Sequence, residues 1–126
     1  MTKSLCLYRA VLVVCLAITL LIGITACGQY DQRYQLDNVT TDHVVVLKKN
    51  TEGNVYSIRV RVRGHIEGRA RISLMLGGTP YQTEFTDGKV NFKWAGDWYS
   101  DTAEIKYEPV DVRSGEFVID YLFATL

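Results

Sequence analysis

Apolar and polar side chains alternate with a period of two from His43 to the end of the chain. Valine, isoleucine, threonine and tyrosine are frequent in this segment, and turn-forming residues recur along it. This pattern is typical of half-buried strands, and no stretch has the sustained period of a helix. The sequence therefore predicts an all-β domain over residues 43–126. About seven antiparallel strands should form a small β-sandwich or flattened barrel, because one sheet cannot bury so many apolar faces.

The alternation also allows strands to be paired. Asp87-Gly88 is typical of a type I′ turn, and a two-residue loop there predicts a hairpin between residues 81–86 and 89–94. In this register one face of the hairpin collects the apolar side chains and the other the polar ones. The face would carry three facing pairs: Phe85 with Val90, Thr83 with Phe92, and Tyr81 with Trp94.

Two further pairs and an opening strand complete the expected fold. A three-residue loop, Ile66-Glu67-Gly68, would join strands 56–66 and 69–76 and place Val62 opposite Ile72. Residues 99–108 would pair with residues 115–124. The opening strand would run over His43–Lys49.

The amino-terminal segment has a different character. Lys3 and Arg9 precede an uninterrupted apolar or small run over residues 10–24, and the next charged residue is Asp31. A positive start, an apolar run and an exit with small residues indicate a secretory signal. An uncleaved transmembrane anchor is the alternative, since residues 10–28 are just long enough to span a bilayer.

The end of this run resembles the lipobox of bacterial lipoproteins. The segment reads Ile24-Thr25-Ala26-Cys27, a branched apolar residue and two small ones before a cysteine. The resemblance implies cleavage between Ala26 and Cys27, removal of residues 1–26, and attachment of diacylglycerol and palmitate-like acyl chains to Cys27. It also implies a membrane location outside the cytoplasm. Gly28 replaces the aspartate that resembles an inner-membrane retention signal, so the expected address is the outer membrane, facing the periplasm.

Charge and cysteine content exclude some classes of partner and of stabilising site. Without Lys3 and Arg9 the chain carries 12 basic and 14 acidic side chains, which argues against a nucleic-acid partner. No cysteine follows Cys27, so we expect neither a disulfide framework nor a cysteine metal site. Residues 28–42 are polar without an apolar period, and with Cys27 they are predicted to form a flexible tether, 27–42.

A row of basic residues is the first candidate binding site. They lie at alternating positions and should project from the face opposite Val60 and Val62, with Arg63 across from Arg71. Because like charges that face each other are destabilising, the row suggests a site for an anionic glycan, a lipid headgroup or an acidic partner. The alternative is neutralisation by acidic residues of the carboxyl-terminal half. The row consists of Arg59, Arg61, Arg63, His65, Arg69 and Arg71.

An acidic and aromatic segment is the second candidate. Such a segment could stack against a sugar or hold a calcium ion, or its tryptophans could simply cap the core. No metal-ligand spacing or complete calcium loop is present, so we expect no metal and no cofactor. The segment consists of Trp94, Asp97, Trp98, Tyr99 and Asp101.

Catalytic signatures are missing from the sequence, and a non-enzymatic protein is expected. The remaining possibility is a carboxylate dyad of Glu104 and Asp120, facing each other across the last two strands, in a small hydrolase. The favoured function is an envelope lipoprotein that binds a protein or another envelope component. The alternative is a periplasmic inhibitor or immunity-type protein that blocks a partner's active site.

Overall fold

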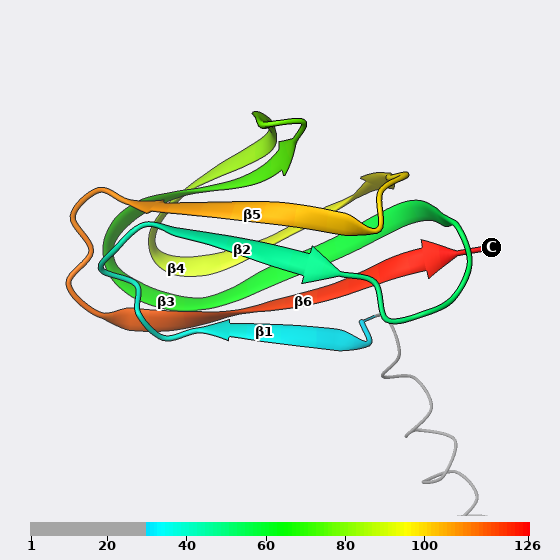
Figure 1. The fold of residues 1–126 in the computed structure, drawn as a ribbon. Helices are drawn as coiled ribbons and strands as arrows, with labels where there is room; N and C mark the ends of the chain where they lie inside the picture. Colours follow the sequence, from blue (N-terminus) through cyan, green and yellow to red (C-terminus); the bar gives the residue numbers. More distant parts are fainter. Residues whose placement is uncertain (1–29) are drawn as a thin grey trace, which may run out of the picture.

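The computed structural model describes residues 30–126, which form six antiparallel strands in a single sheet (Figure 1). The strands are β1 (Gln32–Leu36), β2 (His43–Lys48), β3 (Val55–Leu76), β4 (Thr79–Asp97), β5 (Thr102–Pro109) and β6 (Gly115–Thr125). The predicted all-β class is confirmed. The curled sheet of six strands is consistent with the predicted small sandwich or flattened barrel of about seven strands. β3 and β4, with 22 and 19 residues, are each about three to four times as long as a typical strand, because segments predicted to turn continue as strand.

β3 organises the sheet because both of its edges are paired. β4 runs along one edge for nearly the whole length of β3. The other edge is shared: residues 55–66 of β3 pair with β6, and residues 70–75 pair with β5. β1 then pairs with β6, and β2 pairs with β5, so the strand order is β1-β6-β3-β5-β2 with β4 beside β3.

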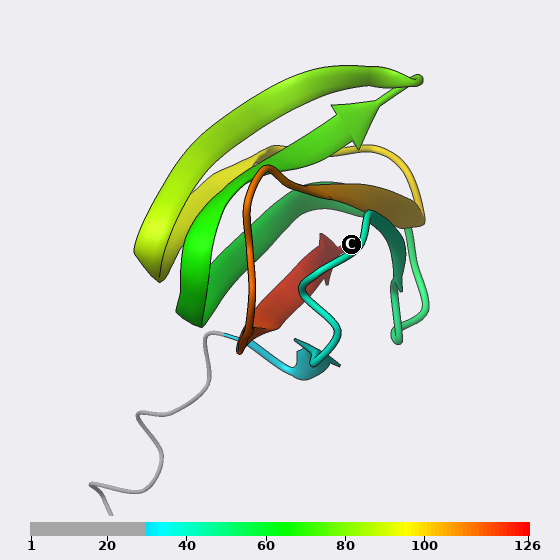
Figure 2. The ribbon, with the colours of Figure 1, turned by 90° about the vertical axis from the view of Figure 1, so that its left-hand side faces the viewer.

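The sheet curls strongly along β3 and β4 (Figure 2). Between His65 and Arg69 the register with β4 shifts, so that β3 advances four residues while β4 advances two. Gly68 lies in this bulge with φ 129°, a conformation that side chains with a Cβ rarely adopt. The bend brings β2 and β5 over the apolar side of β1 and β6, and one sheet thereby encloses a core.

The predicted turns at Asp87-Gly88 and at Ile66-Glu67-Gly68 are both wrong. Both segments lie inside long strands, at the bend where β3 pairs with β4. The observed hairpin turn is Gly77-Gly78, where φ is 60° and 83°. Two consecutive positive φ values are what a type I′ turn requires, and two glycines adopt them without steric cost. Glycine at a bulge and glycine at a turn look alike in sequence.

These turns determine which side chains share a face. Because β4 does not turn at residue 88, Phe85 points outward and is 77% exposed, whereas Val90 and Trp94 are buried. The predicted pairs Phe85–Val90, Thr83–Phe92 and Tyr81–Trp94 are therefore wrong, as is the pair Val62–Ile72. Val62 instead lies between Phe92 of β4 and Ile119 of β6.

The predicted pairing of residues 99–108 with 115–124 is also wrong. β5 and β6 both border β3, on successive parts of the same edge, and do not pair with each other. The opening strand is found at His43–Lys48, where it pairs with β5.

The core lies inside the curl and is built from inward-facing residues of all six strands and their connections. Val60, Val62, Ile66, Ile72 and Ile105 have no accessible surface. Between Ile58 and Leu74, even-numbered residues of β3 face inward on both sides of the bulge, because the bulge adds two residues to β3 and so preserves the alternation.

Part of the predicted tether belongs to this domain. Residues 32–36 form β1, and both Leu36 and Val39 are buried, with 3% and 1% exposure. The hydroxyl of Tyr107 donates a 2.6 Å hydrogen bond to the carbonyl oxygen of Val39. Burial, with a smaller effect of Asp42, raises the pKa of Tyr107 to about 12. The prediction of a flexible spacer is therefore wrong for this segment. The predicted signal peptide and Cys27 lie outside the described residues.

Candidate binding surfaces

The predicted basic row lies on the outer side of β3. Arg59, Arg63, Arg69 and Arg71 are exposed and Arg61 is half-buried, whereas the valines between them are buried. The predicted juxtaposition of Arg63 and Arg71 is wrong, because the two residues lie on opposite sides of the bulge in one strand. Arg63 instead has Val118 of β6 and Asn91 of β4 as its neighbours.

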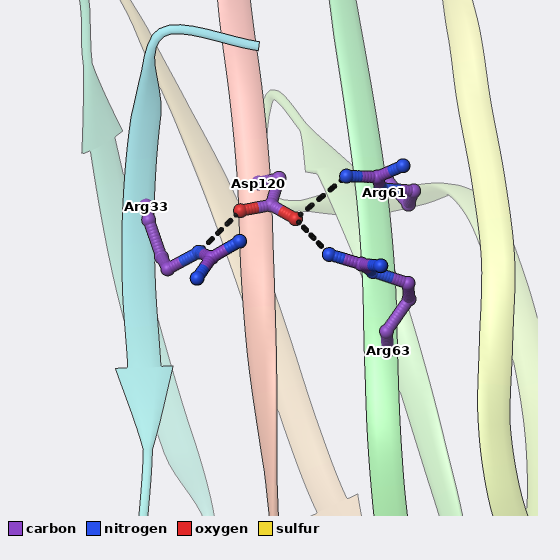
Figure 3. Close-up of polar contacts among 4 residues, drawn as sticks. All are labelled: Arg33, Arg61, Arg63 and Asp120. Atoms are coloured by element: carbon purple, nitrogen blue, oxygen red, sulfur yellow. Dashed lines mark hydrogen bonds and ion pairs between the residues drawn. The ribbon is translucent and has the colours of Figure 1, made fainter. Parts of the chain in front are cut away.

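Asp120 of β6 lies at the centre of an arginine cluster (Figure 3). Its Oδ1 accepts a 2.6 Å hydrogen bond from Nε of Arg33 on β1. Its Oδ2 accepts hydrogen bonds from Nη2 of Arg61 at 3.2 Å and Nη2 of Arg63 at 3.1 Å. The register explains the cluster, since Asp120 pairs directly with Arg33 on one side and with Arg61 on the other.

This cluster determines the charge state of Asp120. Only 4% of its side chain is exposed, and this burial alone would raise its pKa. The hydrogen bonds from the three guanidinium groups outweigh burial, so the pKa of Asp120 lies below its usual value. The same hydrogen bond to Asp120, together with its charge, raises the pKa of Arg33. Asp120 is therefore ionised at neutral pH.

Arg69 and Arg71 of the row pair with acidic residues in or near β5. Arg69 donates to Asp111, with Nη2 to Oδ2 at 2.9 Å, and its backbone N–H donates to Oδ1 of the same carboxylate. Arg71 pairs with Glu108, which also contacts Lys106 at 2.8 Å. Hydrogen bonds from Lys106 and Arg71 lower the pKa of Glu108, and those from Arg69 lower that of Asp111. Intramolecular neutralisation thus accounts for these two arginines.

The acidic and aromatic segment is divided by the structure. Trp94 and Trp98 are buried in the core, and Nε1 of Trp98 donates a 3.0 Å hydrogen bond to the carbonyl of Thr102. Tyr99 is 79% exposed, and Asp97 is also exposed. Asp101 pairs with Lys49 at 3.2 Å. The tryptophans match the core-capping alternative, since neither ring presents an open surface on which a sugar could stack.

The proposed dyad of Glu104 and Asp120 does not form. Glu104 lies on β5 between Val46 and Met75, whereas Asp120 lies on β6 among arginines. A shared proton would raise one carboxyl pKa, but the pKa of Asp120 is lowered. Within residues 30–126, no group of three acidic, histidine or cysteine residues could hold a metal ion.

Sequence reasoning missed two surface features. Arg33 was assigned to the tether, so its part in the Asp120 cluster could not be foreseen. Three large apolar side chains, the apolar outer set, lie on the outer side of the other half of the sheet, on β2 and β4. They are Val44, Val46 and Phe85, with 60%, 48% and 77% exposure. Beside Phe85 an open hollow is lined by Arg71, Ser73 and Met75, among others.

Comparison of the chain with protein-family models and with curated proteins gives no match. Over residues 30–126, no helix has the length and apolar character needed to cross a membrane.

Proposed function

We propose that this protein is a non-enzymatic lipoprotein of the bacterial cell envelope, anchored through Cys27, whose β domain binds another envelope component. The observation that carries the proposal is the sequence Ile24-Thr25-Ala26-Cys27 at the end of an apolar run, shortly before a β domain. Several acyl chains at one residue make anchoring effectively permanent, at about 0.8 kcal/mol per buried CH₂. Gly28 favours the outer membrane as the destination.

A binding role is supported by the outer surface of the domain. The apolar outer set, Val44, Val46 and Phe85, lies on one side of the curled sheet, and Phe85 borders a hollow. Exposed apolar groups beside a concave region are typical of protein-interaction sites. Catalysis has less support, because Glu104 and Asp120 lie on strands that do not pair.

Metabolic labelling with radioactive palmitate tests the anchor. The wild-type chain should incorporate label and lose residues 1–26, whereas the Cys27→Ser variant should incorporate none. Mass spectrometry of the mature amino terminus reports cleavage independently. An intact, unlabelled chain in the soluble fraction, with a free thiol at Cys27, would disprove the anchor.

Crosslinking in intact cells tests the binding role. Phe85→Ser combined with Val46→Ser should abolish a crosslink that the wild-type chain forms. Tyr99→Ser is the matched control, because Tyr99 is as exposed as Phe85 but lies outside the apolar outer set. A specific enzyme recovered as the partner would identify an inhibitor, whereas an abundant envelope protein would identify a structural role. Identical crosslinks from all variants would contradict binding through this set.

A further inference from the structure

Basic side chains dominate the outer face formed by β1, β6, the first half of β3 and the second half of β4. The register aligns Arg33, Asp120, Arg61 and Lys93 in one row across the four strands. Neighbouring rows add Arg59, Arg63 and Lys89, and Glu116 is the second acidic residue of these rows. The exposed acids Asp31 and Asp37 flank β1 at its two ends. Asp97 lies beyond them, at the end of β4. We call the six basic residues the cationic face: Arg33, Arg59, Arg61, Arg63, Lys89 and Lys93.

The single buried acid does not neutralise this face. Asp120 holds three guanidinium groups side by side, but only 4% of its own side chain reaches solvent, whereas Arg33 and Arg63 are 60% and 44% exposed. Each guanidinium group carries five N–H donors, far more than one carboxylate can satisfy. Nε of Arg61 is buried without a hydrogen-bond partner among the described residues. The exposed guanidinium groups of Arg33 and Arg63 therefore present donors and positive charge to solvent, whereas the buried Nε of Arg61 does not.

The chain enters the domain at this same face. The ring centroid of Tyr30, the first described residue, lies 4.7 Å from Cζ of Arg61. Cys27 precedes Tyr30 by three residues, which span about 10 Å even when fully extended. An anchor at Cys27 would thus keep the cationic face close to the bilayer surface.

We propose that the cationic face lies on anionic phospholipid headgroups of the membrane that holds the anchor. This inference rests on the proposed anchoring at Cys27. Phosphodiester groups supply the acceptors that the arginines lack, and each basic residue near an anionic surface strengthens the attraction by about fivefold. The apolar outer set lies on β2 and the first half of β4, outside the strands that carry the cationic face, so it stays accessible to a partner.

A fluorescent label on a single introduced cysteine tests this orientation. The mature lipidated protein is reconstituted into vesicles of phosphatidylcholine alone, or with about one-third phosphatidylglycerol, and both contain a headgroup-linked quencher. Ala95→Cys places the label beside Arg59 on the cationic face, and Val46→Cys places it on the other half. The segment 28–126 contains no cysteine, so the parent protein, with Cys27 acylated, should take no label.

We expect quenching at position 95 to rise at least about twofold when phosphatidylglycerol is present, and to return to baseline in high salt. Quenching at position 46 should depend neither on phosphatidylglycerol nor on the salt concentration. Equal quenching at both positions, or no response to phosphatidylglycerol, would overturn the proposal.

Charge reversal provides the matched pair of variants. Arg59→Glu with Lys93→Glu should lower the response at position 95 to the level in phosphatidylcholine alone. Neither residue contacts Asp120, so the cluster stays intact. Lys48→Glu with Arg113→Glu makes the same change in net charge outside the cationic face and should leave the response unchanged. Equal effects of the two pairs would show that net charge, and not this face, determines the response.

Failure of this inference and failure of the proposed anchor can be told apart. Palmitate incorporation reports the anchor alone, whatever the label at position 95 shows. If Cys27 proves unacylated, the uncleaved chain, held by its apolar segment and with Cys6, Cys15 and Cys27 all changed to serine, carries the same label test. Quenching that responds to phosphatidylglycerol in this chain supports membrane contact by the cationic face without lipidation. If Cys27 is acylated but quenching does not respond, the proposed membrane contact is rejected and the proposed anchor stands.

Discussion

At the scale of the residue, Asp120 allows three arginines to lie together at the surface of the sheet. Without its carboxylate, Arg33 on β1 and the pair Arg61 and Arg63 on β3 would repel one another across β6. The sequence places Arg61 and Arg63 on the outer face through the alternation alone. It gives no sign of their partner, because Asp120 is more than 50 residues away and the strands of the two segments had been paired wrongly.

Asp120→Asn should lower the free energy of unfolding by about 2 kcal/mol, less than a fully buried pair because the arginines stay partly hydrated. Urea denaturation at neutral pH measures the change. Glu116→Gln, at an exposed position on the same strand, should change it by less than about 0.5 kcal/mol. Equal stability of the Asp120→Asn variant and the wild-type protein would contradict the role assigned to this carboxylate.

The lowered pKa of Asp120 also predicts a pH dependence. Its folded pKa lies below the ordinary 3.8, so its contribution is complete above that value and is lost as pH falls toward the folded pKa. Denaturation midpoints should therefore decline as the pH is lowered from about 5, and less steeply in Asp120→Asn. Glu108 and Asp111, whose pKa values are also lowered, should account for the decline that the variant retains. Identical slopes in the two proteins would exclude Asp120 as a contributor.

At the scale of the element, the alternation predicts well which side of the sheet a side chain faces, but it predicts poorly where one strand ends and the next begins. The inward and outward positions of β3 are predicted correctly on both sides of residues 66–68, since the bulge adds an even number of residues. Its continuity could not be predicted, because Gly68 in a bulge and a glycine in a loop have the same local chemistry. β1 was missed for another reason: only Leu36 of its five residues is buried, so it has no periodic signal.

The Gly77-Gly78 turn yields a test of the observed hairpin. Gly77→Val should destabilise the protein by about 1–2 kcal/mol, because β-branched residues disfavour a φ of 60°. Gly77→Asn should be nearly neutral, since asparagine tolerates this conformation and space is open around the position. Thermal unfolding of both variants compares them. If valine and asparagine have the same effect, the turn is not of the type described.

β1 can be tested as a part of the fold. Leu36→Ala should cost about 2–3 kcal/mol in the free energy of unfolding, as expected for a buried leucine. Tyr34→Ala, on the same strand but 42% exposed, should cost much less. Equilibrium denaturation distinguishes the two. A neutral Leu36→Ala variant would restore the tether interpretation of residues 32–36.

At the scale of the whole molecule, the two halves of the curled sheet share β3 and β4. Neither half can unfold without exposing the core of the other, so we expect one cooperative transition. Fluorescence of Trp94 and Trp98, which lie at one end of β4, should report the same midpoint as far-UV circular dichroism, which reports all strands. Separate midpoints would show that the bend at Gly68 divides the protein into two units.

The pairing of β1 with β6 has a consequence for the order of events during synthesis. Residues 32–36 of the first strand find their hydrogen-bond partners at residues 117–121, almost at the end of the chain. Residues 32–36 therefore stay without these partners until residues 117–121 have left the ribosome. The sheet cannot close before then, and removal of residues 117–126 would leave β1 without its neighbour.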